Sequence, residues 1–208
     1  MKDYASYKTE SPIEEDFLRQ ILKHISDDVK LEAQVEMPTR WGMFRADFMV
    51  TTSAGVRIVY ECDGADFHDA WLDDWRDVLT LGEKRADRVV RLRGQDIVYH
   101  LNDLLYALCR TNPEVFTVQG RSRLERLACS EIVKYEGELT RTAMPFSFQD
   151  DSDPIKRFTL LARKMDADDL KGRFFSKCLA WAMEHPGWPV EQLASTFMKD
   201  ISQEATQP

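Results

Sequence analysis

Apolar residues near the start of the chain recur first at helical and then at strand-like spacing. Between Ser11 and Ile25 they fall three and four residues apart, and Ser11 before Pro12 is a strong signal for a helix start. Three extended segments bounded by turn-forming residues follow, Leu31 to Met37, Arg45 to Thr51 and Val56 to Cys62. One helix and then three strands are therefore predicted.

The next segments predict how these strands pair. Thr51 to Gly55 is a hairpin connection, so the second and third strands should be antiparallel neighbours. A helix over Asp69 to Leu81 and a strand over Arg88 to Arg93 follow, and a strand, a crossover helix and a strand favour a parallel pair. With a further helix over Leu101 to Cys109, the order is α-β-β-β-α-β-α. We expect an α/β fold with a central mixed sheet flanked by helices.

Beyond Thr111 the spacing of apolar residues is mostly helical. The predicted helices are Arg123 to Tyr135, Pro154 to Met165, Asp168 to Glu184 and one that begins at Pro189. Met144 to Pro154 is rich in acidic residues, serine and proline, and is the best candidate for a linker. We therefore expect residues 1–110 to form one domain and residues 111–208 to form an α-helical C-terminal extension.

Composition narrows the class of protein. The chain has 208 residues, of which 43% are apolar and 31% charged, and this balance suits a folded domain with an elaboration. No apolar run approaches the roughly 18 residues that a membrane span needs, so we expect a cytoplasmic protein with no membrane partner. Four widely spaced cysteines without a CxxC pair indicate reduced thiols rather than a zinc site.

The net charge of -8 argues against a protein that coats nucleic acid, so DNA binding would need a local basic patch. The segment from Arg76 to Arg93 supplies a candidate. Its basic residues are Arg76, Lys84, Arg85, Arg88, Arg91 and Arg93, and a second cluster follows at Arg121, Arg123 and Arg126. The alternative is an ordinary solvated helix face and strand edge.

Three carboxylates are predicted to converge at the end of one strand. Side chains alternate faces along a strand, so Glu61 and Asp63 point the same way, and Asp47 on the neighbouring strand can reach the same surface. Carboxylate oxygens in that number suit Mg²⁺ or Mn²⁺, which bridge to phosphate and activate water in phosphodiester hydrolysis. The alternative is that Asp63 and Gly64 form an ordinary turn.

An ordered set of motifs surrounds these acids. It consists of Ser11-Pro-Ile-Glu14, Gln34, Arg45-Ala-Asp47-Phe, Val59-Tyr-Glu61-Cys-Asp63-Gly64 to His68, Asp74-x-Arg76-Asp, and Val89-Val-Arg-Leu-Arg to Asp96. Taken together, the set resembles the PD-(D/E)XK nucleases related to very-short-patch mismatch repair endonucleases. The resemblance covers residues 11 to 108, roughly half of the chain.

The resemblance implies a restriction-endonuclease-like core and Mg²⁺-dependent cleavage of DNA, with Mn²⁺ as a substitute. It implies that the metal ligands are Asp47 and Glu61 or Asp63. It also implies that Glu14 is an acid delivered from the first helix and that His68 lies near the scissile phosphate.

The chain departs from the superfamily two residues beyond Glu61, where Asp63 stands in place of the usual lysine. Which group activates the water is therefore open, with Lys84 or Arg91 as substitutes.

Two hypotheses for the function follow. One is an endonuclease in DNA repair, restriction or anti-phage defence, and the other is a catalytically inactive subunit that keeps the fold and binds DNA or protein. A third hypothesis is nuclease activity on RNA. The C-terminal helices would add DNA contacts, a homodimer surface or a site for a protein partner.

Several of these residues also have structural interpretations. Glu14 lies three residues after Ser11 and fits a capping box, and His68 could cap the helix that follows it. Arg76 could stabilise phosphate charge or pair with a nearby aspartate. The tryptophans near the predicted site could stack on bases or fill the core, and they are Trp41, Trp71 and Trp75.

Overall fold

The first half of the chain folds in the predicted order. The computed structural model describes residues 4–64, 69–135, 145–149, 159–169 and 173–204. After a 3-10 turn at Tyr4–Ser6, its elements are α1 (Pro12–Ile21), β1 (Lys30–Thr39), β2 (Gly42–Thr51), β3 (Arg57–Asp63), α2 (Ala70–Gly82), β4 (Arg88–Arg93) and α3 (Gly94–Thr111). The order α-β-β-β-α-β-α and the α/β class are confirmed.

The second half contributes strands as well as helices. Its elements are the 3-10 turns Pro113–Val115 and Ala167–Asp169, α4 (Val118–Leu127), α5 (Ser130–Val133), β5 (Pro145–Gln149), β6 (Thr159–Asp166), α6 (Arg173–Glu184) and α7 (Val190–Glu204). The predicted helix over Pro154 to Met165 is wrong where it overlaps β6, and the predicted linker contains β5. The predicted helix over Arg123 to Tyr135 is interrupted between α4 and α5.

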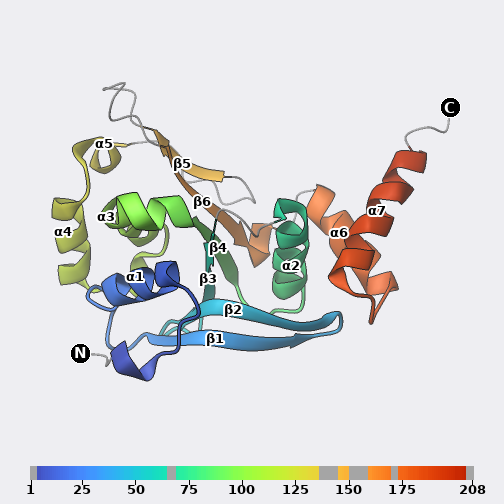
Figure 1. Cartoon of the computed structure of the whole chain (residues 1–208), viewed down its shortest axis with the longest axis horizontal. Coiled ribbons are helices and arrows are strands. Elements are labelled where there is room, and N and C mark those ends of the chain that lie inside the picture. Colours follow the sequence, from blue (N-terminus) through green and yellow to red (C-terminus); the bar gives the residue numbers. More distant parts are fainter. Residues whose placement is uncertain (1–3, 65–68, 136–144, 150–158, 170–172, 205–208) are drawn as a thin grey trace.

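The described strands form one mixed, six-stranded sheet in the order β1-β2-β3-β4-β6-β5. β3 and β4 are parallel, as predicted, and the other neighbouring pairs are antiparallel. β6 therefore pairs with the outer edge of β4 and extends the sheet that the first half began (Figure 1). The free edge of β4 explains why β6 is a strand, because its backbone groups complete a hydrogen-bonded ladder there.

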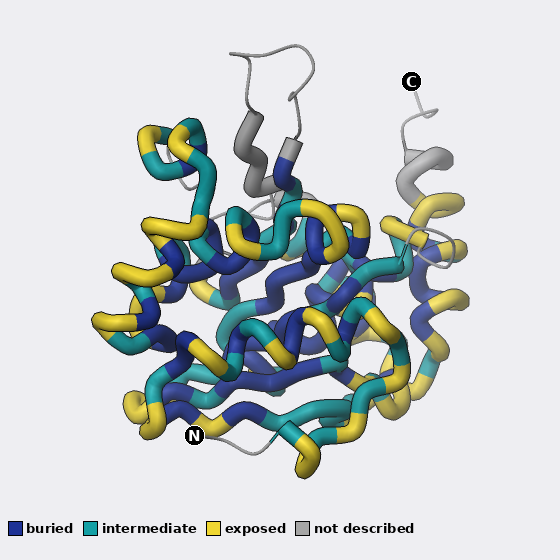
Figure 2. The backbone as a smooth tube through the Cα atoms, turned by 60° about the vertical axis from the view of Figure 1, so that its left-hand side comes forward, coloured by how far each residue is buried: buried dark blue, intermediate teal, exposed yellow. Residues whose placement is uncertain are grey.

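Two hydrophobic cores lie on the two faces of the sheet. Figure 1 shows α1, α3 and α4 on one side and α2, α6 and α7 on the other. The first core includes Phe17, Ile58, Tyr60, Leu104 and Leu160, and the second includes Val59, Trp75, Leu79, Cys178 and Phe197. Successive residues of β3 thus enter opposite cores, as the period of a strand requires. Figure 2 shows these buried strands beneath helices with exposed outer turns.

The C-terminal helices hold the tip of the β1–β2 hairpin. The Trp41 indole Nε1 donates to the Ala182 carbonyl oxygen at 3.1 Å, and the Gly187 N–H donates to the Arg40 carbonyl oxygen at 3.1 Å. The Trp75 ring of α2 meets the Phe197 ring of α7 edge to face, with 5.3 Å between centroids. The two halves of the chain therefore share one sheet and its cores.

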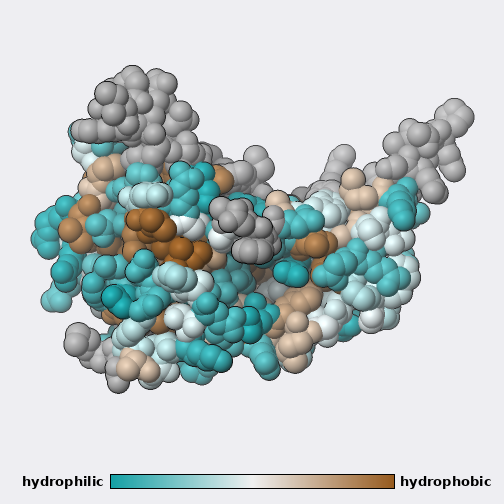
Figure 3. Space-filling model, in the orientation of Figure 1, coloured by the Kyte–Doolittle hydropathy of each residue, from teal (hydrophilic) through white to brown (hydrophobic). Residues whose placement is uncertain are grey.

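The surface is largely polar. Figure 3 shows a mostly hydrophilic face whose main hydrophobic area lies over α3, where Val98 is 54% exposed. Among the helices that the structure describes, none combines the length and apolar character needed to cross a membrane.

Candidate functional site

A cleft of about 950 Å³ lies beside the end of the β2–β3 ladder. It is formed by the start of α1, the β1–β2 hairpin, the end of β3, α2 and the start of α7. Its acidic lining residues are Glu10, Glu14, Glu36, Asp47, Glu61, Asp73, Asp77 and Glu191, and its basic lining residues are Arg45, Arg76 and Arg91. Acidic groups outnumber basic ones there, so the cleft favours a bound cation.

Asp47 and Glu61 are neighbours in this cleft. The antiparallel ladder between their strands ends at the pair Phe48 and Tyr60, and Asp47 and Glu61 are the next residues along. Asp47 Oδ2 accepts the Cys62 N–H at 2.7 Å, and Glu61 Oε2 accepts the Asp47 N–H at 3.4 Å. Each carboxylate is thus tied to the backbone of the adjacent strand.

The two carboxylates disfavour each other's charged form. Burial raises the pKa of Asp47 to about 6, with further contributions from Glu14 and Asp63. Burial also raises the pKa of Glu61 well above its ordinary value, and the Asp47 charge adds to that effect. A proton or a cation between them relieves the repulsion. Mg²⁺ is commonly bound by one or two carboxylates together with water and substrate phosphate, so this pair fits it.

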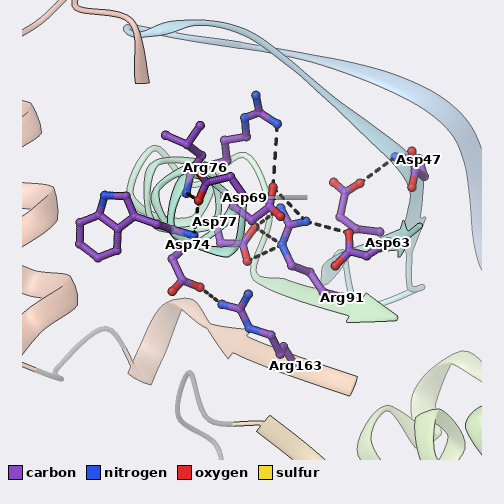
Figure 4. Close-up of polar contacts among 12 residues, drawn as sticks. Asp47, Asp63, Asp69, Asp74, Arg76, Asp77, Arg91 and Arg163 are labelled. Carbon is purple, nitrogen blue, oxygen red and sulfur yellow. Dashed lines mark hydrogen bonds and ion pairs between the residues drawn. The ribbon is translucent and has the colours of Figure 1, made fainter. Parts of the chain in front are cut away.

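Asp63, the third predicted ligand, faces an arginine (Figure 4). Arg91 Nη1 donates to Asp63 Oδ1 at 3.0 Å, and the same guanidinium binds both oxygens of Asp77 at 2.9 to 3.1 Å. Asp73 Oδ1 lies 3.5 Å from Arg91 Nη1. Over the described part of the chain, no three His, Cys, Asp or Glu side chains are placed to hold a metal ion together. The structure therefore brings together Asp47 and Glu61, and it joins Asp63 to Arg91.

Glu14 has the predicted structural role and also lies near the pair. Ser11 is the N-cap of α1; its hydroxyl donates to Glu14 Oε1 at 2.8 Å and accepts the Glu14 N–H at 3.3 Å. Glu14 Oε2 accepts the Glu10 N–H at 2.9 Å, one residue before the cap. The capping role of Glu14 is thus confirmed in part, because its carboxylate bonds the Ser11 hydroxyl and the Glu10 N–H rather than the predicted N–H of the cap residue. The same carboxylate is close enough to Asp47 to raise its pKa, so capping and proximity coexist.

Gln34 is a site residue to which the sequence assigned no role. It lies within β1 with a φ of 52°, in the left-handed region that residues other than glycine rarely adopt. The ladder pairs Ala33 with Phe48 and Val35 with Ala46, so Gln34 and Asp47 occupy the position between them. Gln34 Nε2 donates to Glu14 Oε2 at 2.7 Å. Gln34 therefore links β1 to Glu14 at the position in the ladder that lies opposite Asp47.

Two substitutions at Gln34 should separate backbone strain from the side-chain bond. Gln34→Ala and Gln34→Gly both remove the hydrogen bond to Glu14, but only glycine adopts a positive φ without cost. Gln34→Gly is therefore expected to be more stable than Gln34→Ala by about 1 kcal/mol. Urea denaturation of the two variants measures this difference. Equal stability would show that the left-handed backbone at Gln34 carries no strain.

The predicted basic residues do not form one surface. Arg76 is 47% exposed at the cleft and lies 3.9 Å from carboxylate oxygens of Asp73 and Glu191. Arg93 binds Asp96 through two hydrogen bonds of 2.8 and 3.0 Å. Arg91 is only 6% exposed and is held by aspartates, which corrects its placement in an exposed patch. Lys84 and Arg85 line a second, separate hollow.

The tryptophans that the sequence placed near the site belong to the second hydrophobic core or pack against it. Trp41 and Trp75 are buried and pack in the second core, and Trp41 also lines the cleft. Trp71 is partly buried and packs against that core. His68 lies outside the described residues.

The free energy of unfolding of the metal-free protein should depend on whether Asp47 is ionised. Because the pKa of Asp47 rises from 3.8 to about 6 on folding, the folded state holds the extra proton between these values, and stability falls as the pH rises through about 6. Asp47→Asn removes this dependence. Its stability relative to the unaltered protein is therefore expected to increase by about 1 kcal/mol between about pH 5 and about pH 7.5. Thermal denaturation in EDTA at both pH values tests this, and an unchanged difference would contradict it.

Comparisons with protein-family models, curated proteins and solved structures gave no match for this chain.

Proposed function

We propose that the protein is a Mg²⁺-dependent endonuclease that hydrolyses phosphodiester bonds in DNA, with a role in DNA repair, restriction or anti-phage defence. The observation that carries the proposal is the Asp47 and Glu61 pair, two carboxylates fixed side by side in an acidic cleft with raised pKa values. The resemblance of the surrounding motifs to PD-(D/E)XK nucleases supports the same assignment.

Asp47 and Glu61 are the residues that would hold the ion. A bound Mg²⁺ or Mn²⁺ would supply Lewis acidity and a water of lowered pKa. The chain itself holds the carboxylates in place, since backbone N–H groups of β2 and β3 bond to them. Arg76, half-exposed at the cleft, is positioned to contact a phosphate group. Arg91 forms an ion pair of 3.0 Å with Asp63, so the proposed metal ligands are Asp47 and Glu61.

The direct test is a cleavage assay with supercoiled plasmid and with labelled duplex, mismatched and single-stranded oligonucleotides. RNA of the same sequence tests the alternative hypothesis of nuclease activity on RNA. Cleavage is expected with Mg²⁺ or Mn²⁺ and none in EDTA. Activity that persists in EDTA, or no cleavage of any of these substrates with either ion, would overturn the proposal.

The second candidate function is a catalytically inactive subunit that binds DNA or protein, and the ion pair between Asp63 and Arg91 favours it. That pair occupies the position where a lysine would be expected to activate water. Calorimetric titration with Mn²⁺ discriminates the two functions, because an active site binds the ion and loses binding when Glu61→Gln is introduced. A homodimer or partner surface on the C-terminal helices remains a prediction for either function.

A further inference from the structure

A second hollow of about 540 Å³ lies between the tip of the β1–β2 hairpin and the loop that joins α2 to β4. Its charged lining residues are Arg40, Glu83, Lys84 and Arg85, and Pro38, Thr39, Gly82 and Met183 complete it. Three cations and one carboxylate therefore meet in this hollow, in a chain whose net charge is -8. The net charge of its lining residues is thus opposite in sign to that of the acidic cleft.

The single carboxylate of the hollow organises two of the cations. The Glu83 side chain is only 9% exposed, and its Oε1 accepts the Arg40 N–H at 3.3 Å and lies 3.1 Å from Arg40 Nε. Its Oε2 lies 3.5 Å from Arg85 Nη2. Glu83 thus fixes one guanidinium from the hairpin and one from the loop on the same hollow.

Lys84 supplies a third cation without a carboxylate of its own. Its backbone has a φ of 56°, and its carbonyl oxygen accepts a hydrogen bond from the Arg57 guanidinium. The residue is exposed, and within the described part of the chain no carboxylate lies within ion-pair distance of its ammonium. Lys84 is therefore available to an external anion.

The hollow adjoins the candidate active-site cleft across the hairpin. Pro38 lines the hollow and Met43 lines the cleft, and these two residues are cross-strand partners in the β1–β2 ladder. Directly opposed residues of antiparallel strands are about 5 Å apart at Cα, so only the width of the hairpin separates the two cavities. A polyanion lying in the cleft can continue over the hairpin tip into the hollow.

We propose that this basic hollow, formed by Arg40, Lys84 and Arg85, binds a backbone phosphate of the nucleic acid whose adjacent segment occupies the cleft. The inference rests on the proposed nuclease function. The cleft is too acidic to attract a phosphate chain by itself, whereas Lys and Arg contacts supply affinity by releasing counterions from the phosphates. The hollow gives a substrate affinity that the Asp47 and Glu61 pair does not.

Fluorescence anisotropy with fluorescein-labelled duplex and single-stranded oligonucleotides, in EDTA to prevent cleavage, tests the hollow. The variant is Lys84→Glu, and the control is Lys30→Glu, which makes the same charge change at the opposite end of β1. Lys84→Glu is expected to weaken binding about tenfold at low salt and to reduce the salt slope by about 1. Lys30→Glu should leave both quantities nearly unchanged. Lys84→Asn, which suits the left-handed backbone, provides a second variant should Lys84→Glu fold poorly.

The outcomes separate this inference from the proposed function. Equal effects of the two charge reversals would overturn the hollow while leaving metal-dependent cleavage intact. A protein that binds nucleic acid through Lys84 but cleaves none of it would support the hollow and overturn the nuclease. A protein that binds no nucleic acid at all would overturn the hollow as well.

Discussion

Asp47→Asn is expected to abolish divalent-cation-dependent cleavage while the protein stays folded. The amide oxygen of asparagine still accepts the Cys62 N–H that now bonds Asp47 Oδ2, so the β2–β3 contact survives. The negative charge that would hold the ion is lost. A metal ion contributes several kcal/mol to such a transition state, so the rate should fall by about 10³-fold or more. Initial rates on labelled oligonucleotides at saturating Mg²⁺ measure the effect.

The matched control for this substitution is Glu36→Gln, which makes the same carboxylate-to-amide change on an exposed residue of the same cleft. Its rate should be close to that of the unaltered protein. The thermal midpoint of Asp47→Asn should be equal or higher, because a desolvated charge has been removed. Retained activity in Asp47→Asn would contradict the assignment of Asp47 to the metal site.

Arg91→Met is expected to lower the free energy of unfolding by a large amount. The guanidinium is 6% exposed and holds Asp63, Asp73 and Asp77 together, and methionine replaces its aliphatic part without the charge. Removing one partner from a buried ionic group usually costs about 3 to 5 kcal/mol, since the remaining charges stay buried without compensation. Urea denaturation at about pH 7.5 tests this value.

The loss in Arg91→Met should shrink on acidification. Burial already raises the pKa of Asp77 to about 6 even though Arg91 lowers it, so the carboxyl takes up a proton readily once the arginine is gone. The control is Arg76→Met, whose ion pairs are half-exposed and 3.9 Å long and should contribute less than about 1 kcal/mol. Equal losses in the two variants would show that Arg91 does not compensate the buried aspartates.

The sequence predicted those elements whose pattern is local. Helix α1, the hairpin of β2 and β3, and the parallel pair of β3 and β4 follow from apolar spacing and turn residues within short windows. Strand β6 could not be predicted in this way, because it forms by pairing with β4, an edge made much earlier in the chain. Its mixed apolar spacing is compatible with either a helix or a strand, and the tertiary pairing decides between them.

The candidate site could also be predicted only where it depends on local patterns in the sequence. Strand alternation and the hairpin placed Asp47 beside Glu61, and the structure brings them together. The pairing of Asp63 with Arg91 depends on the parallel register that puts Arg91 opposite Glu61, and on two aspartates of α2 that hold its guanidinium. The left-handed backbone of Gln34 could not be predicted from the sequence, because a positive φ is not typical of glutamine.

The late arrival of β6 has a consequence for synthesis of the protein. While the ribosome is still translating the residues after α3, the strand β4 has its parallel partner β3 but lacks the antiparallel partner that will cover its other side. An uncovered strand edge recruits other extended chains. We therefore expect the nascent chain to be prone to aggregation until β6 has emerged and paired with β4.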